Sequence, residues 1–295
     1  MSSQKRFVAV FGIILAFSAA ALAQTAQVVT PDQPAKLQLS SGQFFLVYQL
    51  FSITIATMGA AFIFFILGRQ NLSEKYRTAM LVSALVVAVA CYHYFRIFNS
   101  WNEAYALTNG IYGATGVAFN DAYRYADWIL TVPLLLVETV AVLALASNVA
   151  AGMIGRLVIA AFLMIATGYP GEISNDTGTR LLWGTISTIP FIYIVYTLFV
   201  ELGKSLATQP PRVQVLVRNL RLLLFMSWGF YPIAYLLPLV FGNLSGSGVV
   251  AVQVGYSLAD IIAKAGFGTL IYFIALEKTK ADGGYKGDTA AAIGD

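Results

Sequence analysis

Two ionisable side chains near the end of the chain, Asp260 and Lys264, stand four residues apart within a long apolar stretch. On a helix this spacing places both on one face, separated by one turn. A charged group at the depth of a membrane is costly, and such groups commonly line ion pathways and proton relays. The pair is therefore interpreted as part of a functional site, with a structural salt bridge as the alternative.

A second apolar stretch carries a stripe of polar side chains. At about 100° per residue, its members fall within an arc of roughly 60° on a helix. Lipid cannot solvate such a stripe, so it is expected to face the interior of a helix bundle. Its two carboxyl groups, eleven residues apart, are separated by roughly 16 Å along the axis. The stripe consists of Arg124, Asp127, Thr131 and Glu138.

The charges of these two stretches nearly balance, since Arg124 and Lys264 oppose Asp127 and Asp260. A balanced quartet lowers the cost of keeping charge in a membrane. Glu138 has no evident partner, so burial favours its neutral form, unless it reaches the membrane surface instead. Arg124 and His93, the only histidine, are further candidates, each with a purely structural role as the alternative.

Seven apolar segments must position these residues. The chain has 295 residues, of which 58% are hydrophobic and only 11% charged, and its mean hydropathy is +0.74. A soluble domain needs more charge to cover its surface. Each segment is close to the ~20 residues that a membrane helix requires. The sequence therefore predicts an all-α membrane protein, a seven-helix bundle, with segments at 43–68, 78–98, 122–145, 150–169, 181–203, 216–240 and 249–277.

The two ends of the chain are expected to lie outside this bundle. Residues 1–23 have the pattern of a cleaved signal peptide: Lys5 and Arg6, a short apolar run, and a small-residue site ending at Ala23. An uncleaved anchor helix is the alternative. Residues 24–42 are expected to form an exported tail, 43–277 the helical domain, and 278–295 a disordered cytoplasmic tail. The loop at 99–121 could hold a small hairpin of open register.

Lysine and arginine are unevenly divided between the two sets of loops. The positive-inside rule makes the richer set cytoplasmic and the mature N-terminus external. The formal net charge of +4 is thereby explained without a nucleic-acid partner, and no metal site is expected. The richer set contains Arg69, Lys75, Arg77, Arg156, Lys204, Arg212, Arg218, Arg221, Lys278, Lys280 and Lys286.

Several segments together resemble the microbial rhodopsins, and in particular the proteorhodopsin and xanthorhodopsin proton pumps. The resemblance covers all seven segments. The motifs that carry it are Tyr256-Ser-Leu-Ala-Asp260-Ile-Ile-Ala-Lys264, Arg124-Tyr-Ala-Asp127-Trp128-Ile-Leu-Thr131 continuing to Glu138, Trp228-Gly-Phe-Tyr231-Pro232-Ile-Ala-Tyr235, Cys91-Tyr-His93-Tyr-Phe-Arg96 and Gly168-Tyr-Pro-Gly-Glu172.

The resemblance implies an all-trans retinal bound as a Schiff base to Lys264. Such a linkage needs an amine that can lose its proton, which a desolvated lysine supplies. Taken singly, each aromatic residue at a matching position is more simply explained as core packing. As a set beside Lys264, the matching positions predict the retinal pocket: Trp128, Leu135, Met164, Ser187, Thr188, Trp228, Tyr231, Pro232, Tyr235 and Tyr256.

The resemblance also implies a direction of transport. Light drives a proton from Lys264 to the acceptor Asp127, and Glu138 then returns a proton from the cytoplasmic side. Asp260 and Arg124 complete the counterion cluster, and Thr131 bonds near Asp127. His93 is expected to pair with Asp127, so that the two titrate together. The loop at 242–248, between the last two apolar segments, lacks the carboxylates that release the proton early in haloarchaeal pumps, which leaves the release group open.

Two positions refine the resemblance. Leu135 is apolar where the blue-absorbing relatives carry a polar residue, and so favours green absorption. Gly184 stands where xanthorhodopsins leave an opening for a carotenoid antenna, and a small residue for close helix packing is the alternative.

Other functions fit less well. Sodium pumps place Asn, Asp and Gln where this chain has Asp127, Thr131 and Glu138, and chloride pumps lack the acceptor Asp. A sensory photoreceptor is the main alternative, although sensors often lose the donor carboxyl. The sequence therefore predicts a light-driven transporter rather than an enzyme, in a bacterial inner membrane, assembled as trimers or pentamers.

Overall fold

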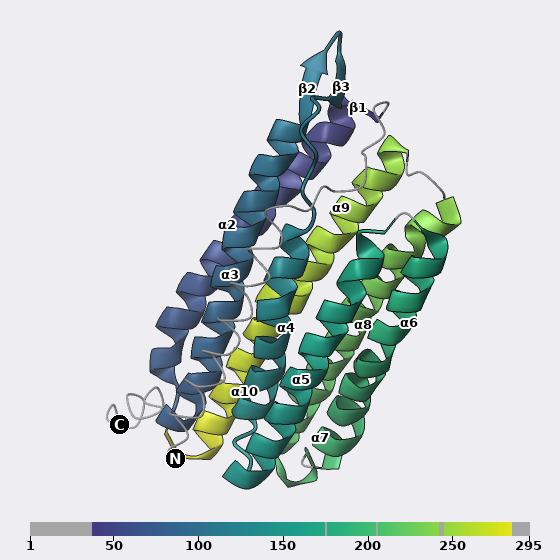
Figure 1. Ribbon diagram of the computed structural model, residues 1–295. Coiled ribbons are helices and arrows are strands. Elements are labelled where there is room, and N and C mark those ends of the chain that lie inside the picture. The colour runs from purple at the N-terminus through teal and green to yellow at the C-terminus, as the bar shows by residue number, and fades with distance from the viewer. Residues whose placement is uncertain (1–36, 175, 205, 242–244, 285–295) are drawn as a thin grey trace, which may run out of the picture.

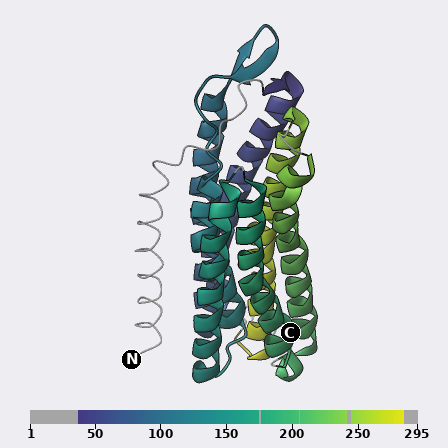
Figure 2. The ribbon, with the colours of Figure 1, turned by 45° about the vertical axis from the view of Figure 1, so that its right-hand side comes forward.

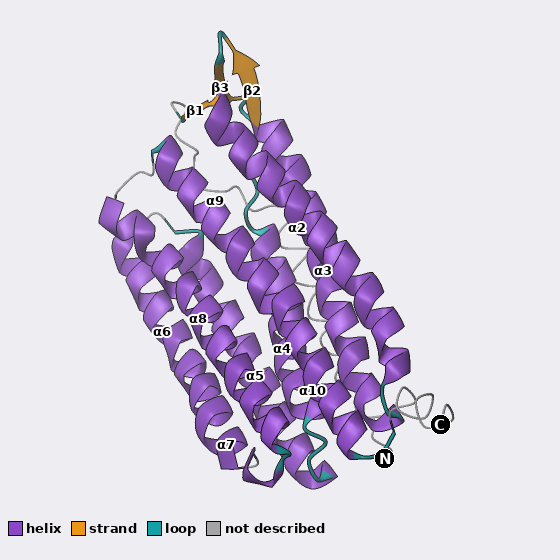
Figure 3. Cartoon of the chain, turned by 180° about the vertical axis from the view of Figure 1, so that it is seen from behind, coloured by secondary structure: helices purple, strands orange, loops and turns teal. Residues whose placement is uncertain are grey.

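The computed structural model describes residues 37–174, 176–204, 206–241 and 245–284. Within this part of the chain, seven helical segments are long and apolar enough to cross a membrane. They run side by side as one bundle, with the strands confined to one end (Figures 1 and 3). The end that carries the strands is called the hairpin end, and the opposite end the tail end. The predicted seven-helix architecture is confirmed.

The helices alternate in direction through the bundle, and most extend beyond the predicted apolar segments. The described membrane-spanning units are α2 (Ser41–Gly68), α3 (Glu74–Ala104), α4 (Tyr123–Val142), α5 (Ser147–Glu172), α6 (Thr177–Tyr196) with α7 (Leu202–Lys204), α8 (Pro211–Phe241), and α9 (Gly246–Asp260) with α10 (Phe267–Ala281). Hydropathy marks only the stretch that lies in lipid, whereas backbone hydrogen bonding carries most of the helices into the polar flanks; α4 instead lies within its predicted segment.

Local sequence explains where several of these helices begin. Ser40 and Gln43 form a capping box that starts α2: Gln43 N donates to Ser40 Oγ at 3.2 Å, and Ser40 N donates to Gln43 Oε1 at 2.9 Å. Asp176 caps α6 by accepting a hydrogen bond from Thr179 N at 2.7 Å. That bond to the anionic carboxylate lowers the pKa of Asp176.

A three-stranded antiparallel sheet stands at the hairpin end, and the hairpin that belongs to it projects beyond the helices (Figure 2). Its order is β1 (Gln38–Ser40), β3 (Ile111–Ala114), β2 (Tyr105–Thr108). The register left open by the sequence is fixed by a two-residue turn, Asn109-Gly110, whose φ angles of 52° and 83° suit the tight hairpin turns.

The predicted domain limits are partly corrected. Residues 37–42, assigned to the exported tail, form β1 and the start of α2. The last helix continues to Ala281, four residues into the predicted disordered tail. The signal peptide, residues 24–36 and residues 285–295 lie outside the described part of the chain and stay predictions.

Two units contain a π-helical turn, at Thr197–Glu201 and at Ile261–Gly266. The second joins α9 to α10 and contains Lys264. Such turns are uncommon in helices and occur frequently at functional sites.

Candidate functional site

Lys264 lies at the centre of the bundle and is 2% exposed. Its Nζ atom contacts two carboxylates, Asp127 Oδ2 at 2.5 Å and Asp260 Oδ1 at 2.8 Å. Asp127 is on α4, and Asp260 precedes Lys264 by one turn, as the spacing predicted. An isolated ammonium group would be very costly in this environment, and two hydrogen-bonded carboxylates offset that cost.

Asp260 is held by a shell of donors from three other helices. Tyr231 OH donates to Oδ1 at 2.5 Å, Tyr94 OH to Oδ2 at 2.8 Å, and Trp128 Nε1 to Oδ1 at 3.3 Å. Hydrogen bonds to a carboxylate favour its charged form. By contrast, Asp127 Oδ1 has no partner among the described residues. Asp260 is therefore the more fully hydrogen-bonded carboxylate of the pair, and Asp127 keeps one oxygen without a hydrogen bond in the described structure.

Arg124 binds mainly to a carboxylate that the sequence analysis missed. Its Nε donates to Asp121 Oδ1 at 2.6 Å, whereas its NH1 is 4.0 Å from Asp260 Oδ2. Its other donors reach Tyr94 OH at 2.9 Å and Gln253 Oε1 at 2.6 Å. The expected quartet is thus extended toward the hairpin end. Asp121 precedes the apolar segment, and only its spacing of three from Arg124 could have indicated the pair.

His93 approaches Asp127 without forming a hydrogen bond. The distance from its Nδ1 to Asp127 Oδ1 is 4.0 Å, and Nδ1 lies 3.0 Å from the carbonyl oxygen of Val89. Its Nε2 has no partner among the described residues. Thr131 donates to the backbone oxygen of Asp127 at 2.9 Å, so it contacts this residue through the main chain and not through the carboxyl group.

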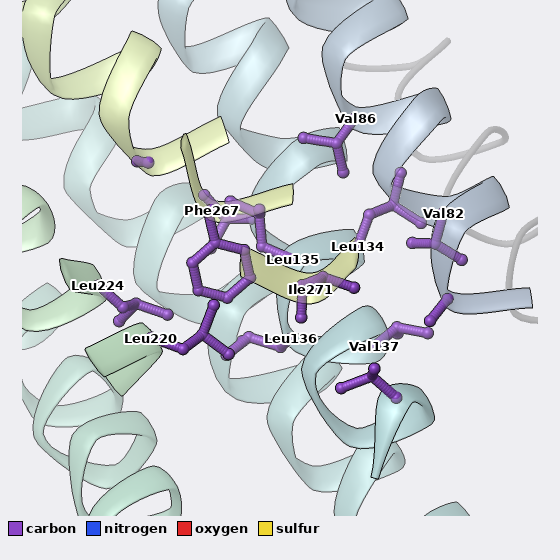
Figure 4. Close-up of a cluster of buried hydrophobic side chains, with 14 of the residues drawn as sticks. Val82, Val86, Leu134, Leu135, Leu136, Val137, Leu220, Leu224, Phe267 and Ile271 are labelled. Atoms are coloured by element: carbon purple, nitrogen blue, oxygen red, sulfur yellow. The ribbon is translucent and has the colours of Figure 1, made fainter. Parts of the chain in front are cut away.

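Glu138 lies on the tail-end side of Lys264 and is fully buried. Ser83 Oγ donates to its Oε2 at 2.6 Å, while Oε1 has no partner in the described part of the chain. Ser83 is a contact that the sequence did not predict. The expectation that Glu138 is buried is met, and the alternative of reaching the surface is not. The residues shortly before Glu138 on α4, including Leu134 and Leu135, belong to a buried apolar cluster with Leu220, Leu224, Phe267 and Ile271 (Figure 4).

A cavity of ≈ 320 Å³ adjoins Lys264. All the predicted pocket residues lie on its wall, together with Gly184 and Asp260. Several hydroxyl groups of the wall bond to backbone oxygens, as Ser187 does to Met164 O and Thr188 to Gly184 O, which leaves apolar surface facing the cavity. The wall residues that the sequence analysis did not assign to the pocket are Tyr125, Val132, Ile165, Gly168, Leu181, Thr185, Phe191, Leu236 and Ala263.

One side of the cavity is formed by exposed residues of α6 and α8: Leu181, Thr185, Thr188, Pro232 and Leu236. Gly184 lies among them. A Cβ atom there would stand 2.8 Å from Cε1 of Tyr235, closer than real side chains approach. Glycine at this position therefore permits close packing of α6 on the buried Tyr235 ring, and the exposed wall residues around it are compatible with an opening on this side. Both readings of Gly184 fit the contact.

The chain belongs to the bacteriorhodopsin-like protein family, whose model matches residues 46–278. A green-light absorbing proteorhodopsin from a gamma-proteobacterium is 31% identical over 232 residues, which cover 78% of this chain and 86% of the relative. Bacteriorhodopsin from Halobacterium salinarum is 30% identical over 222 residues, which cover 73% and 79%.

Solved structures show the same fold. Xanthorhodopsin, described as a light-driven ion pump with dual chromophore, is 53% identical with a TM-score of 0.81, over 84% of this chain and 99% of that one. A thermophilic rhodopsin is 49% identical with a TM-score of 0.82 over the same shares. The predicted resemblance to the proteorhodopsin and xanthorhodopsin type is confirmed, and the chain is a multi-pass membrane protein.

Proposed function

We propose that this chain is a light-driven outward proton pump that carries retinal covalently on Lys264. The observation that carries the proposal is the placement of three groups along the bundle. Lys264 lies between the Asp127–Asp260 pair on one side and the buried Glu138 on the other, beside an apolar cavity. The similarity to proteorhodopsins and xanthorhodopsin supports the same activity.

The residues present fit retinal. Lys264 is part of one cavity wall, and the other walls are apolar or aromatic, as a long polyene requires. Trp128 and Trp228 belong to the wall, with Leu135 and Met164, so they would hold the chain of the cofactor. When bound, retinal supplies absorption of visible light and a change of shape that redirects the Lys264 N–H.

The pumping residues are assigned from their contacts. Asp127 accepts the proton from the Lys264 nitrogen, since it touches Nζ and has an unpartnered oxygen. Asp260 stays ionised, because three donors and Arg124 stabilise its charge. Glu138 holds its proton in the dark and gives it to the Lys264 nitrogen afterwards. Its apolar surroundings disfavour the anion, and Ser83 supplies one hydrogen bond when the anion forms.

The hairpin end is proposed to face outward. Most loop lysines and arginines, such as Arg69, Lys75 and Arg212, lie at the tail end, which the positive-inside rule assigns to the cytoplasm. Moving each proton outward against 100 mV then requires about 2.3 kcal/mol. Location in a bacterial inner membrane and assembly as trimers or pentamers are proposed on the basis of the family resemblance. Native mass spectrometry in nanodiscs tests the assembly.

Illumination of cells that express the chain with retinal tests the proposal. We expect the medium to acidify in light and the signal to vanish with a protonophore. Asp127→Asn and Glu138→Gln should remove or strongly slow it, whereas Asp176→Asn, a loop carboxylate at the hairpin end, should not. A slow photocycle without acidification would instead support a sensory photoreceptor.

A second chromophore is also proposed, on the α6–α8 side of the cavity. Exposed wall residues surround Gly184 there, and the xanthorhodopsin structure is described as having a dual chromophore. A hydroxylated carotenoid lying on this side would transfer excitation to retinal. Adding such a carotenoid should produce its bands in the excitation spectrum of retinal fluorescence. Their absence would leave Gly184 as a packing residue.

A further inference from the structure

A buried lysine at the tail end has no part in the site described so far. Lys278, in the last turns of α10, is 6% exposed. Its Nζ donates to the backbone oxygen of Leu143 at 2.6 Å and to Gln209 Oε1 at 2.7 Å. It also lies 5.3 Å from the ring centroid of Tyr76. Within the described residues, no carboxylate is in ion-pair contact with Lys278.

These contacts join four parts of the bundle. Leu143 directly follows α4, and its carbonyl is one of those that a helix C-terminus leaves without an internal partner. A cation is favoured there by the helix dipole. Gln209 belongs to the segment just before α8, and its own backbone oxygen accepts from Gln214 Nε2 at 2.9 Å. Tyr76 is on α3. One ammonium group on α10 thus holds α3, α4 and the start of α8 together.

This junction lies between Glu138 and the tail-end surface. Leu143 follows Glu138 by five residues, about 7.5 Å along a helix. Glu138 itself is fully buried, and a route from the tail-end surface along α4 to Glu138 runs past the elements that Lys278 joins. Separating them breaks two hydrogen bonds of a charged group in a poorly solvated place, and this makes the closed arrangement the stable one.

We propose that the hydrogen bonds of Lys278 keep the cytoplasmic entrance to Glu138 closed. Release of its contacts with Leu143 and Gln209 opens the passage through which Glu138 regains a proton. The inference rests on the proposed pump, in which Glu138 is the donor. Lys278 acts here as a positioning residue, because it holds the passage shut and exchanges no proton with Glu138.

Two substitutions test this role of Lys278, each in the full-length chain with retinal in nanodiscs. Lys278→Met keeps an unbranched apolar stem and removes the charge, and Gln209→Leu removes one acceptor. Lys280→Met is the matched control, since Lys280 is in the same helix end with its side chain 40% exposed and bonded to Glu277. Both test variants break the contact between Lys278 and Gln209. The effect of the double variant should therefore be smaller than the sum of the two single effects.

The first readout is hydrogen exchange in the dark. Backbone amides of residues 141–145 and 206–214 should exchange about tenfold faster in Lys278→Met, the factor that corresponds to one lost hydrogen bond to a charged group. Lys280→Met should leave them unchanged. Unchanged exchange in Lys278→Met overturns the proposal that Lys278 holds these elements together. This readout tests the closing role of Lys278 even if light moves no protons, so its outcome is separate from that of the proposed pump.

The second readout is the recovery of the Glu138 proton after a laser flash, followed by infrared absorption of its carboxyl group. Lys278→Met and Gln209→Leu should each speed this recovery several-fold, and Lys280→Met should not. A slower recovery in Lys278→Met overturns the proposal, since it would mean that Lys278 delivers protons to Glu138 and does not obstruct them.

Discussion

The hydrogen bond between Ser83 and Glu138 allows the proposed donor step to be tested quantitatively. Ser83 Oγ lies 2.6 Å from Glu138 Oε2, and both side chains are buried. A hydrogen bond to a neutral group contributes about 1 kcal/mol, whereas one to a charged group contributes about 1.5–3 kcal/mol. Ser83→Ala should therefore disfavour the Glu138 anion by about 1 kcal/mol more than it disfavours the neutral acid.

A difference of this size corresponds to about a fivefold change in an equilibrium. If the transfer rate follows the stability of the anion, the return of a proton to the Lys264 nitrogen should slow by up to about fivefold. Flash photolysis measures this step, because the deprotonated nitrogen absorbs at shorter wavelength. The earlier transfer from Lys264 to Asp127 should keep its rate, since Ser83 contacts neither residue.

Thr139→Val is the matched control. Thr139 is buried beside Glu138 on α4, and its hydroxyl bonds only to the backbone oxygen of Leu135 in the described structure. Equal slowing in both variants would point to general loosening of the packing between α3, which carries Ser83, and α4, which carries Thr139. An unchanged or faster return step in Ser83→Ala would refute the assignment of Glu138 as a donor that must ionise.

Three further predictions concern the cofactor site, the cavity side and the tail end. Lys264→Ala should abolish visible absorption, and by leaving Asp127 and Asp260 without their cation it should lower the free energy of unfolding by about 3–5 kcal/mol, as seen in a thermal melt; a variant that still binds retinal covalently would exclude Lys264 as the attachment point. Gly184→Trp should remove carotenoid bands from the retinal excitation spectrum, whereas Gly155→Trp, at a site with no atoms within 4 Å of an added Cβ, should keep them. The ion pair with Lys75 at 2.8 Å lowers the pKa of Asp282. The ion pair therefore stabilises the fold fully above the ordinary aspartate pKa of about 3.9, and this contribution is lost as the pH falls through the lowered pKa of Asp282. Asp282→Asn should accordingly reduce stability at pH 7 by less than about 1 kcal/mol, since the pair is partly exposed, and should have no effect near pH 2; an equal effect at both values would show that the charge is not responsible.

Much of the site could be predicted because it rests on helix periodicity. The spacing of Asp260 and Lys264, and the stripe from Arg124 to Glu138, require only that the segments are helical and that charges avoid lipid. The pocket positions came from the family resemblance, and all of them line the cavity. The sequence predicted contacts between side chains of different helices less well. Ser83 is an ordinary small residue in its segment, and nothing in its sequence neighbourhood indicates that it faces Glu138.

The remaining errors have a common physical origin. Hydropathy detects the part of a helix that lies in lipid, so it is silent about polar residues just beyond that part. Asp121 and Gln253, which hold Arg124, and Lys278, which joins the tail-end elements, lie near such boundaries. The Asn109-Gly110 turn was a readable signal, and its φ angles explain why those two residues occur there.

The order of proton movements between Asp127 and Glu138 is the most direct test of the pump. Time-resolved infrared spectroscopy after a flash resolves the carboxyl stretch of each protonated acid, and Asp127→Asn and Glu138→Gln assign the bands. We expect a band from protonated Asp127 to rise as the Lys264 nitrogen loses its proton, followed by loss of the Glu138 band as that nitrogen regains one. Loss of the Glu138 band first, or protonation of Asp260 in place of Asp127, would contradict the proposed outward path.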